Sequence, residues 1–411
     1  MNRIGLIASF VFLSLLVISW IAAGSGEVSY NSDSRDSVMI RSCLSHNELQ
    51  RLDSTNFIYD PAEILVQVRK ELKRSIRDSR FSLLHIGDSH IASGFWSDRF
   101  RELMQKCFGS AGRGLVLPFG NSSLSTNRDY SITSPQKWTS VKLTQPRSSS
   151  VDFGVGGYLF RTASSTVTFD VSSEEPFDRV RVFCHSEAPR FEVADSVAAE
   201  ICCPDTIAEC MTIVLKKSVN KVQLKGRTVE GFRRPIYYGM SLESGNSGVL
   251  YHAVGVIGAA MEHYNHNPEI LAAAKNLEPN LVIVSLGTNE SFGKNFTWDY
   301  FHHHITEMVE SIRSAAPQAA IIFTTPMENC RRSRGRYVVN KNARLASEVL
   351  KNYAGEFGYA VWDWYEISGG AGTSKSWVSR GLMQSDRIHL TSEGYRLQAE
   401  LLFSALIRDV E

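Results

Sequence analysis

The stretch that decides the fold is FSLLHIGDSH, residues 81–90. Its first six residues are mostly apolar and predict one buried strand; the Gly-Asp pair that follows ends it before a helical segment over about 95–107. Ser89 therefore comes at the carboxyl end of a buried strand, where open α/β sheets place ligands and chemistry. The same residues also fit a turn that only caps a helix. The interpretation depends on whether the chain supplies partners for Ser89.

Further apolar runs predict strands that alternate with helices. The expected strands cover residues 248–256, 281–286, 319–325 and 359–364, and the expected helices cover 61–78, 258–277, 299–316, 338–357 and 391–407. Such alternation favours a parallel sheet with helices on both faces. We therefore expect an α/β fold.

The segment 131–245 has a different pattern. Apolar and polar residues alternate in short runs, among them STVTFDV at 165–171 and RVRVFC at 179–184, with Gly, Pro, Asp and Ser between them. This alternation is typical of antiparallel strands. We predict an inserted all-β sandwich over 131–245, which divides the α/β domain into parts 61–130 and 246–411.

The N-terminus is expected to direct export. Residues 4–23 are apolar apart from three serines, follow a single arginine and end in small residues. This pattern is typical of a secretory signal, and about twenty apolar residues also suffice for an uncleaved anchor. We predict a signal peptide or membrane anchor over 1–24 and a linker over 25–60. The remainder would lie in the periplasm or cell envelope, either released or anchored in the inner membrane.

The composition excludes some function classes. Lys and Arg number 44 against 43 Asp and Glu, which gives a formal net charge of +1, and there is no long basic run. A nucleic-acid partner is therefore not expected. The spacing of the seven cysteines does not match a zinc site, and we expect neither a metal nor an organic cofactor. The oligomeric state is left open.

A base for Ser89 is available near the C-terminus. Serine is a weak nucleophile until a base takes its proton, and that base is usually a histidine oriented by a carboxylate. The segment SDRIHLTSEGY, residues 385–395, supplies Asp386 and His389 just before the last predicted helix. On one loop the two can approach each other, with the second ring nitrogen facing Ser89. The alternative is a surface Asp and His at the start of a helix.

Acyl transfer also needs hydrogen-bond donors for an oxyanion. The backbone N–H of Ser89 is one. After the next strand, GVIG at 255–258 lets the backbone approach a ligand closely, and after the third strand GTNE at 287–290 offers the amide of Asn289. Each segment alone also fits a strand-to-helix turn. Because all of them follow strands of one sheet, the catalytic interpretation is favoured.

These segments resemble the four blocks of the SGNH (GDSL-like) hydrolase superfamily. The matching residues are GDSH at 87–90, the region of Gly258, GTNE at 287–290 and DRIH at 386–389. The resemblance implies a flavodoxin-like three-layer fold. Carried over by position, it implies a catalytic triad of Ser89, Asp386 and His389 and an oxyanion hole of Ser89, Gly258 and Asn289. Gly255 is the alternative to Gly258.

A narrower resemblance is to the peptidoglycan O-acetylesterase branch. It rests on residues 87–118, 248–259, 362–377 and 386–395. That branch carries a β-rich module, similar to a carbohydrate-binding module, between its first two blocks. The resemblance implies a serine esterase that removes O-acetyl groups from a polysaccharide, peptidoglycan above all, through an acetyl-serine intermediate. The same triad would serve a polysaccharide O-acetyltransferase, and the same scaffold a non-catalytic glycan-binding protein.

Three other features each have two interpretations. His90 could contact substrate or face solvent at a helix start. Trp362, Trp364 and Trp377 could form a wall on which sugars stack, or they could pack in the core. The run RRSRGR, residues 331–336, is expected to be a short basic loop, either simply solvated or attractive to an anionic glycan.

Overall fold

The computed structural model describes residues 55–118, 129–146, 152–185, 190–193, 199–202, 210–227 and 236–408. The predicted signal peptide or anchor, 1–24, and most of the predicted linker lie outside these ranges. Among the described residues, no helix is both long and apolar enough to cross a membrane.

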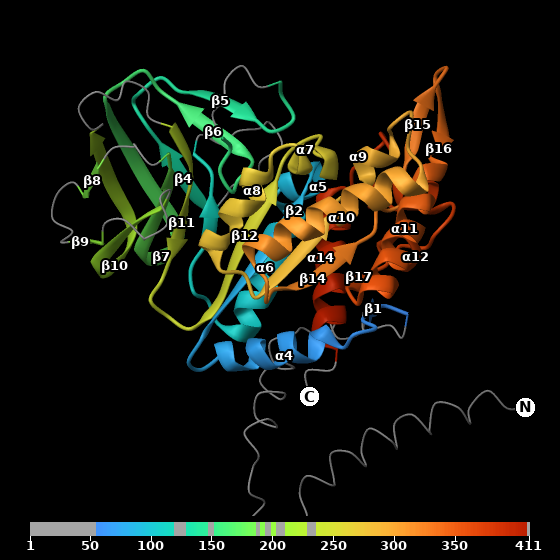
Figure 1. Ribbon diagram of the computed structural model, residues 1–411, viewed down its shortest axis with the longest axis horizontal. Helices are drawn as coiled ribbons and strands as arrows, with labels where there is room; N and C mark the ends of the chain where they lie inside the picture. The colour runs from blue at the N-terminus through green and yellow to red at the C-terminus, as the bar shows by residue number, and fades with distance from the viewer. Residues whose placement is uncertain are drawn as a thin grey trace, which may run out of the picture. The chain divides into compact units, whose positions relative to one another are not determined.

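In the described part of the chain, the central sheet has five parallel strands and one antiparallel edge strand (Figure 1). The strands are, in spatial order, β1 (Ile58–Tyr59), β17 (Ala360–Trp362), β14 (Ala320–Thr324), β13 (Leu281–Ser285), β2 (Arg80–Gly87) and β12 (Gly248–Gly255). Numbered along the chain, the parallel strands have the order 2-1-3-4-5 of a flavodoxin-like sheet. The predicted α/β class and all five predicted strands are confirmed.

Strand β1 lies inside the predicted linker. Ile58 pairs antiparallel with Trp362 and is buried, whereas Phe57 and Tyr59 on either side of it are exposed. The linker prediction is therefore wrong at these positions. A two-residue strand is too short to give a periodic signal in the sequence, and it forms because the edge of β17 is available to pair with it.

Two groups of helices cover the two faces of the sheet (Figure 1). One group contains α4 (Ile64–Ser75), α6 (Phe95–Phe108) and α14 (Ser392–Ile407); the other contains α7 (Met261–Asn265), α8 (Pro268–Ala272), α10 (Trp298–Ala315) and α11 (Lys341–Phe357). Shorter helical segments are α5 (Ser89–Ala92), η1 (Ala273–Leu277), α9 (Thr288–Ser291), α12 (Trp364–Ile367) and α13 (Thr373–Ser379). The single helix expected over 258–277 is divided, because Pro268 starts a new helix rather than continuing one.

A buried polar chain crosses the sheet beneath its carboxyl edge. His85 on β2 bonds Tyr251 Oη through Nδ1 at 2.6 Å and Ser285 Oγ through Nε2 at 2.7 Å. Thr324 Oγ1 donates to the same Ser285 oxygen at 2.8 Å. Burial lowers the pKa of His85 to about 3, so the ring is neutral. The chain supplies hydrogen-bond partners for polar groups that the core has removed from water.

The insertion between β2 and β12 forms an antiparallel sheet with nine strands among the described residues. They are β3 (Gly114–Val116), β4 (Tyr130–Thr133), β5 (Thr139–Lys142), β6 (Tyr158–Arg161), β7 (Thr166–Cys184), β8 (Arg190–Val193), β9 (Ala199–Cys202), β10 (Cys210–Arg227) and β11 (Ile236–Glu243). The inserted antiparallel β module is confirmed. Its sheet also includes β3, which precedes the predicted boundary at 131 and pairs with β11.

The long strands β7 and β10 are shared by two parts of this sheet. The first half of β7 pairs with β4 and the second half with β11, while register shifts interrupt its pairing with β10 between Val214 and Lys221. Aromatic rings from both parts meet in the module core: the ring centroid of Tyr237 lies 5.1 Å from Phe169 and 5.8 Å from Phe191. The two parts of the sheet therefore share one apolar core.

Two of the minor sequence predictions are resolved by the fold. Residues 331–336 are not a loop but belong to a hairpin of β15 (Cys330–Ser333) and β16 (Arg336–Val339). Arg334 and Gly335 both have positive φ in the connecting turn, a geometry that suits a tight hairpin. The basic composition of the run gave no indication of strands. The three tryptophans, Trp362, Trp364 and Trp377, are all buried, so they pack in the core and offer no wall for sugars.

Candidate active site

Ser89 is held at the carboxyl end of β2. The strand ends at Gly87, and Ser89 is the first residue of α5. Asp88 caps this helix, because its carboxylate accepts the backbone N–H of His90 at 2.9 Å. Ser89 is 8% exposed. The short cap and the buried strand therefore fix the hydroxyl at the edge of the sheet.

A chain of hydrogen bonds connects Ser89 to His389 and Asp386. Ser89 Oγ lies 3.0 Å from His389 Nε2, and His389 Nδ1 lies 2.7 Å from Asp386 Oδ2. A carboxylate only accepts, so Nδ1 carries the proton and Nε2 is left to accept the serine hydroxyl. The structure thus brings together three side chains that lie up to 300 residues apart in the sequence.

The loop before α14 sets the position of this carboxylate. Asp386 Oδ1 accepts the backbone N–H groups of Ile388 at 2.9 Å and His389 at 3.0 Å, while Arg387 between them takes a positive φ of 58°. Burial alone would raise the pKa of Asp386, but the hydrogen bonds from His389 and from these N–H groups outweigh it and lower the pKa to about 2. Asp386 is therefore ionised at neutral pH.

The pair of Asp386 and His389 also changes the pKa of the histidine. The hydrogen bond with Asp386 raises the pKa of His389 above its ordinary value, against burial, which lowers it. His90, whose ring centroid is 5.4 Å from that of His389, stays neutral because burial lowers its pKa to about 3. His389 is therefore more basic than a free histidine, and no second cation opposes it from this side.

His90 connects the two helices on either side of the site. It is half-buried, its Nδ1 bonds the hydroxyl of Tyr395 at 2.9 Å, and its ring packs beside His389. It therefore joins the beginning of α5, which carries Ser89, to the beginning of α14, which follows His389. A contact of His90 with substrate stays a prediction.

The two glycines after β12 have different environments. Gly255 ends the strand, and a Cβ on it would collide with the backbone of Ala92, so its role is to let α5 approach β12. Gly258 lies three residues further on, exposed and with φ of 81°. It occupies the third position of a turn closed by the Ala259 N–H on Val256 O at 2.9 Å. Of the two, only Gly258 presents open backbone.

Asn289 ties three loops together. Its amide nitrogen donates to Asp88 Oδ2 at 3.0 Å and to Ala259 O at 2.8 Å. Asp88 precedes Ser89 and Ala259 follows Gly258, so the amide lies between the two segments that carry the other predicted donors. Both amide hydrogens are engaged here. An oxyanion contact from Asn289 requires that one of these hydrogens be released or shared.

Sequence reasoning gave no role to two buried carboxyl groups in this network. Glu290 accepts Met261 N at 2.7 Å with one oxygen and Gly287 N at 2.9 Å with the other. It therefore joins the loop after β13 to the helix that follows the Gly258 turn. Burial raises the pKa of Glu290 and of Asp88 to about 7. Both residues stand in the quoted motifs, and for Asp88 the available signal was an acidic residue directly after a buried strand.

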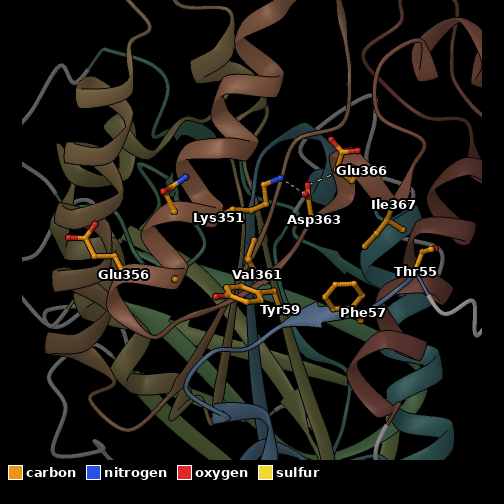
Figure 2. Close-up of a pocket in the computed structure, with 11 residues that line it drawn as sticks. Thr55, Phe57, Tyr59, Lys351, Glu356, Val361, Asp363, Glu366 and Ile367 are labelled. Carbon is orange, nitrogen blue, oxygen red and sulfur yellow. Dashed lines mark hydrogen bonds and ion pairs between the residues drawn. The ribbon is translucent and has the colours of Figure 1, made fainter.

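An open groove of about 890 Å³ lies elsewhere, at the β1 and β17 edge of the sheet (Figure 2). Phe57 and Tyr59 form one wall and residues of α11 another, and Lys351 bonds Asp363 at 2.7 Å within it. None of the predicted site residues is among the described residues that line it. Ser89 and His389 thus lie outside this groove, towards the β2, β12 and β13 end of the sheet.

Comparison with known proteins gives a family match over the C-terminal part of the chain. Residues 229–397 match the GDSL-like lipase/acylhydrolase family. This range contains Gly258, Asn289, Asp386 and His389, whereas Ser89 lies upstream of the β module and outside the match. No curated protein sequence matches the chain.

Among solved structures, a peptidoglycan O-acetylesterase is similar over 86% of this chain and 99% of its own, with a TM-score of 0.71 and 22% identity. A lipase/acylhydrolase from Enterococcus faecalis matches 38% of this chain and 74% of its own, with a TM-score of 0.29 and 20% identity. An acetylxylan esterase from Geobacillus stearothermophilus matches 39% and 73%, with a TM-score of 0.30 and 16% identity. The match to the peptidoglycan O-acetylesterase covers more of this chain than the α/β domain contains, so it includes the β module.

The chain therefore carries a GDSL-like lipase/acylhydrolase domain of the SGNH hydrolase superfamily, a carboxylic ester hydrolase domain, and shares its overall fold, inserted β module included, with a peptidoglycan O-acetylesterase.

Proposed function

We propose that this protein is a serine esterase that acts outside the cytoplasm and removes O-acetyl groups from a polysaccharide, with peptidoglycan as its substrate. The observation that carries the proposal is the hydrogen-bond chain Ser89–His389–Asp386 at the carboxyl edge of the sheet. The apolar N-terminal segment supports export. The similarity in fold to a peptidoglycan O-acetylesterase supports the choice of substrate.

In the first half of the reaction, Ser89 becomes acetylated. His389 Nε2 takes the hydroxyl proton while Ser89 Oγ attacks the carbonyl carbon of the acetyl ester. The carbonyl oxygen gains the negative charge of the tetrahedral intermediate. His389 then gives its proton to the sugar oxygen, the ester C–O bond breaks, and the sugar alcohol leaves. Asp386 stabilises the imidazolium that forms between these two transfers.

In the second half, water releases the acetate. His389 takes a proton from a water molecule, whose oxygen attacks the carbonyl carbon of acetyl-Ser89. The second tetrahedral intermediate breaks down when His389 returns the proton to Ser89 Oγ. Acetic acid, which ionises to acetate in water, and the free hydroxyl of Ser89 are the products, so protons and bonds balance without any cofactor.

Both intermediates need donors for the oxyanion. In this proposal the donors are the N–H of Ser89 at the start of α5, the N–H of Gly258 and the amide of Asn289. Gly258 is exposed with no atom close to where a Cβ would lie, so a carbonyl oxygen can approach its backbone. Asn289 exchanges one of its present bonds, to Asp88 or to Ala259, for the oxyanion.

Acetate release from O-acetylated peptidoglycan, wild type beside Ser89→Ala, tests the proposal. Release by the wild type alone is the expected result. Turnover of a small aryl acetate by the wild type without acetate release from peptidoglycan would keep the esterase and discard the substrate. Transfer of the acetyl group to an added sugar acceptor, with no acetate release when the acceptor is absent, would identify an acetyltransferase. Glycan binding without any ester turnover would identify a binding protein.

A further inference from the structure

The inserted β module contacts the loop that carries Gly258. Lys142, the last residue of β5, places its ammonium nitrogen 3.3 Å from the carbonyl oxygen of Ile257. Thr144 directs its hydroxyl at the same oxygen from 3.5 Å, a longer and weaker contact. Ile257 immediately precedes Gly258 in the chain. Two donors of the module therefore meet on the carbonyl group of one peptide unit beside the site.

The contact belongs to a packed interface. Leu143 is 4% exposed, and its backbone N–H donates to Gly157 O at 3.0 Å. A Cβ at Gly157 would come within 2.8 Å of both Leu143 and Val256, so these three residues interlock. Nearby, Phe153 N donates to Glu269 Oε1 at 3.2 Å and adds a second contact between the module and the α/β domain. The backbone that carries Lys142 is thus fixed relative to the Gly258 turn.

The geometry of the turn explains why this carbonyl matters. Ile257 and Gly258 are the central residues of the turn closed by Ala259 N on Val256 O, and φ of 81° at the third position is that of a type II turn. The peptide between them is planar and trans, so its C=O and N–H point in opposite directions. A donor that fixes the Ile257 oxygen therefore also fixes the direction of the Gly258 N–H.

The central peptide of such a turn can adopt two orientations. Types I and II differ by a rotation of this peptide that reverses its C=O and N–H, and glycine tolerates either. Around Gly258 itself, no atom lies within 4 Å of the Cβ position, so local packing does not select one orientation. A positive charge at the Ile257 oxygen favours the orientation observed and also polarises the N–H at the other end of the unit.

We propose that Lys142 of the β module is a positioning residue for the oxyanion hole, which it acts on through the Ile257–Gly258 peptide. The module is then a part of the catalytic apparatus and not only an attached domain. The inference rests on the proposed function, because it requires the Gly258 N–H to be an oxyanion donor. Thr144 adds a smaller contribution through the same oxygen.

Lys142→Met tests this, since it keeps most of the aliphatic side chain and removes the charge. The substrate is a small aryl acetate, and the matched control is Lys221→Met, an exposed lysine on β10 of the same module. Direct removal of an oxyanion donor costs about 10²- to 10³-fold in kcat. For an indirect effect we expect Lys142→Met to lower kcat about tenfold with KM nearly unchanged. Lys142→Arg should recover most of the loss, and Lys221→Met should match the wild type.

A second variant ties the effect to this peptide. Alanine at Gly258 disfavours a positive φ and favours the reversed peptide. In a Gly258→Ala background, Lys142→Met should therefore have little further effect on kcat, whereas with Asn289→Ala the two losses should multiply. Thermal unfolding of each variant shows whether it is folded.

Three results would overturn the inference: wild-type kcat in Lys142→Met, a loss confined to KM for the aryl acetate, or a loss that Lys142→Arg does not recover although the protein is folded. The proposed function fails separately, when wild type and Ser89→Ala do not differ in ester hydrolysis. If the wild type depends on Ser89 and Lys142→Met is fully active, only the present inference is wrong.

Discussion

The α/β domain and the β module present their contributions to the site in different ways. In the α/β domain, each block directly follows a strand or precedes a helix, so chain order alone brings Ser89, Gly258 and Asn289 to one edge of the sheet. In the module, Lys142 reaches the same edge only because β5 packs on the turn after β12. Local sequence therefore predicts the site residues that strand order brings together, such as Ser89 and Asn289. It does not predict a residue such as Lys142, whose position depends on how the β module packs against the central sheet.

The largest expected effect tests the α/β side of this comparison. Ser89→Ala removes the nucleophile, and the remaining donors can only stabilise attack by water. Loss of a nucleophile in a serine hydrolase costs about 10⁶-fold in kcat, and we expect a loss of at least about 10⁴-fold here. Hydrolysis of an aryl acetate, measured on protein with unchanged thermal unfolding, checks this. Residual activity near that of the wild type would remove Ser89 from the mechanism.

Asp386→Asn should give the next largest effect. The variant loses the carboxylate that orients His389, for which a loss of about 10⁴-fold in kcat is a reference value. The carboxylate also raises the pKa of His389. Because the base acts when neutral, the activity of the wild type should fall as pH decreases through a pKa above the ordinary 6.5 of histidine.

In Asp386→Asn that acidic limb should move to lower pH, since the cause of the raised pKa has been removed. The pH dependence of kcat/KM for an aryl acetate measures the acidic limb of the wild type and that of the variant. The matched control is Glu393→Gln, an exposed carboxylate in the first turn of α14. An unchanged acidic limb in Asp386→Asn would show that another group sets it.

Asn289→Ala should have an intermediate effect. It removes one oxyanion donor, at a cost of about 10²- to 10³-fold in kcat. It also removes the hydrogen bond that Asp88 Oδ2 accepts, while Asp88 Oδ1 keeps the N–H of His90. Glu290→Gln should cost less, because one oxygen remains to accept a backbone N–H while the other position becomes a donor facing a second N–H. Equal kcat in Asn289→Ala and wild type would leave the two backbone N–H groups as the whole oxyanion hole.

The smallest effect on chemistry is expected at the ion pair that joins the two regions. Arg80 on β2 bonds the fully buried Glu243 of β11 at 2.7 Å and Ser244 O at 2.8 Å. Arg80→Met leaves the buried carboxylate of Glu243 without this arginine. Loss of one partner of a buried ion pair lowers the free energy of unfolding by about 3–5 kcal/mol. Arg181, 3.8 Å from Glu243, should keep the loss near the lower end.

Chemical denaturation of Arg80→Met measures this loss and shows whether the two regions unfold together. We expect one transition shifted to lower denaturant, with kcat of the folded protein within about twofold of the wild type. Arg227→Met on β10 of the module is a suitable control, because Arg227 is exposed and pairs with Thr166, whereas Glu243 pairs with Arg179 towards the other end of β7. Two separate transitions would contradict the description of the module as firmly docked.

The sequence predicted those parts of the molecule that local patterns determine. The five parallel strands gave apolar runs, and the order of Ser89, Asn289, Asp386 and His389 placed them on one edge. The bridging role of Glu290 was hidden because its partners, Met261 and Gly287, come from different segments. Likewise, strand β1 has no periodicity of its own, and Lys142 is one charged residue among many on alternating strands.

The most direct test of the central claim is to look for the acetyl group on Ser89. Aryl acetates acylate serine hydrolases quickly and allow the acyl-enzyme to accumulate, so wild-type protein mixed with one and quenched in acid should carry a single acetyl group on the peptide containing Ser89. Ser89→Ala should carry none and release no acetate above background. Acetate release by the wild type without acetyl-Ser89, together with equal release by Ser89→Ala, would contradict the account.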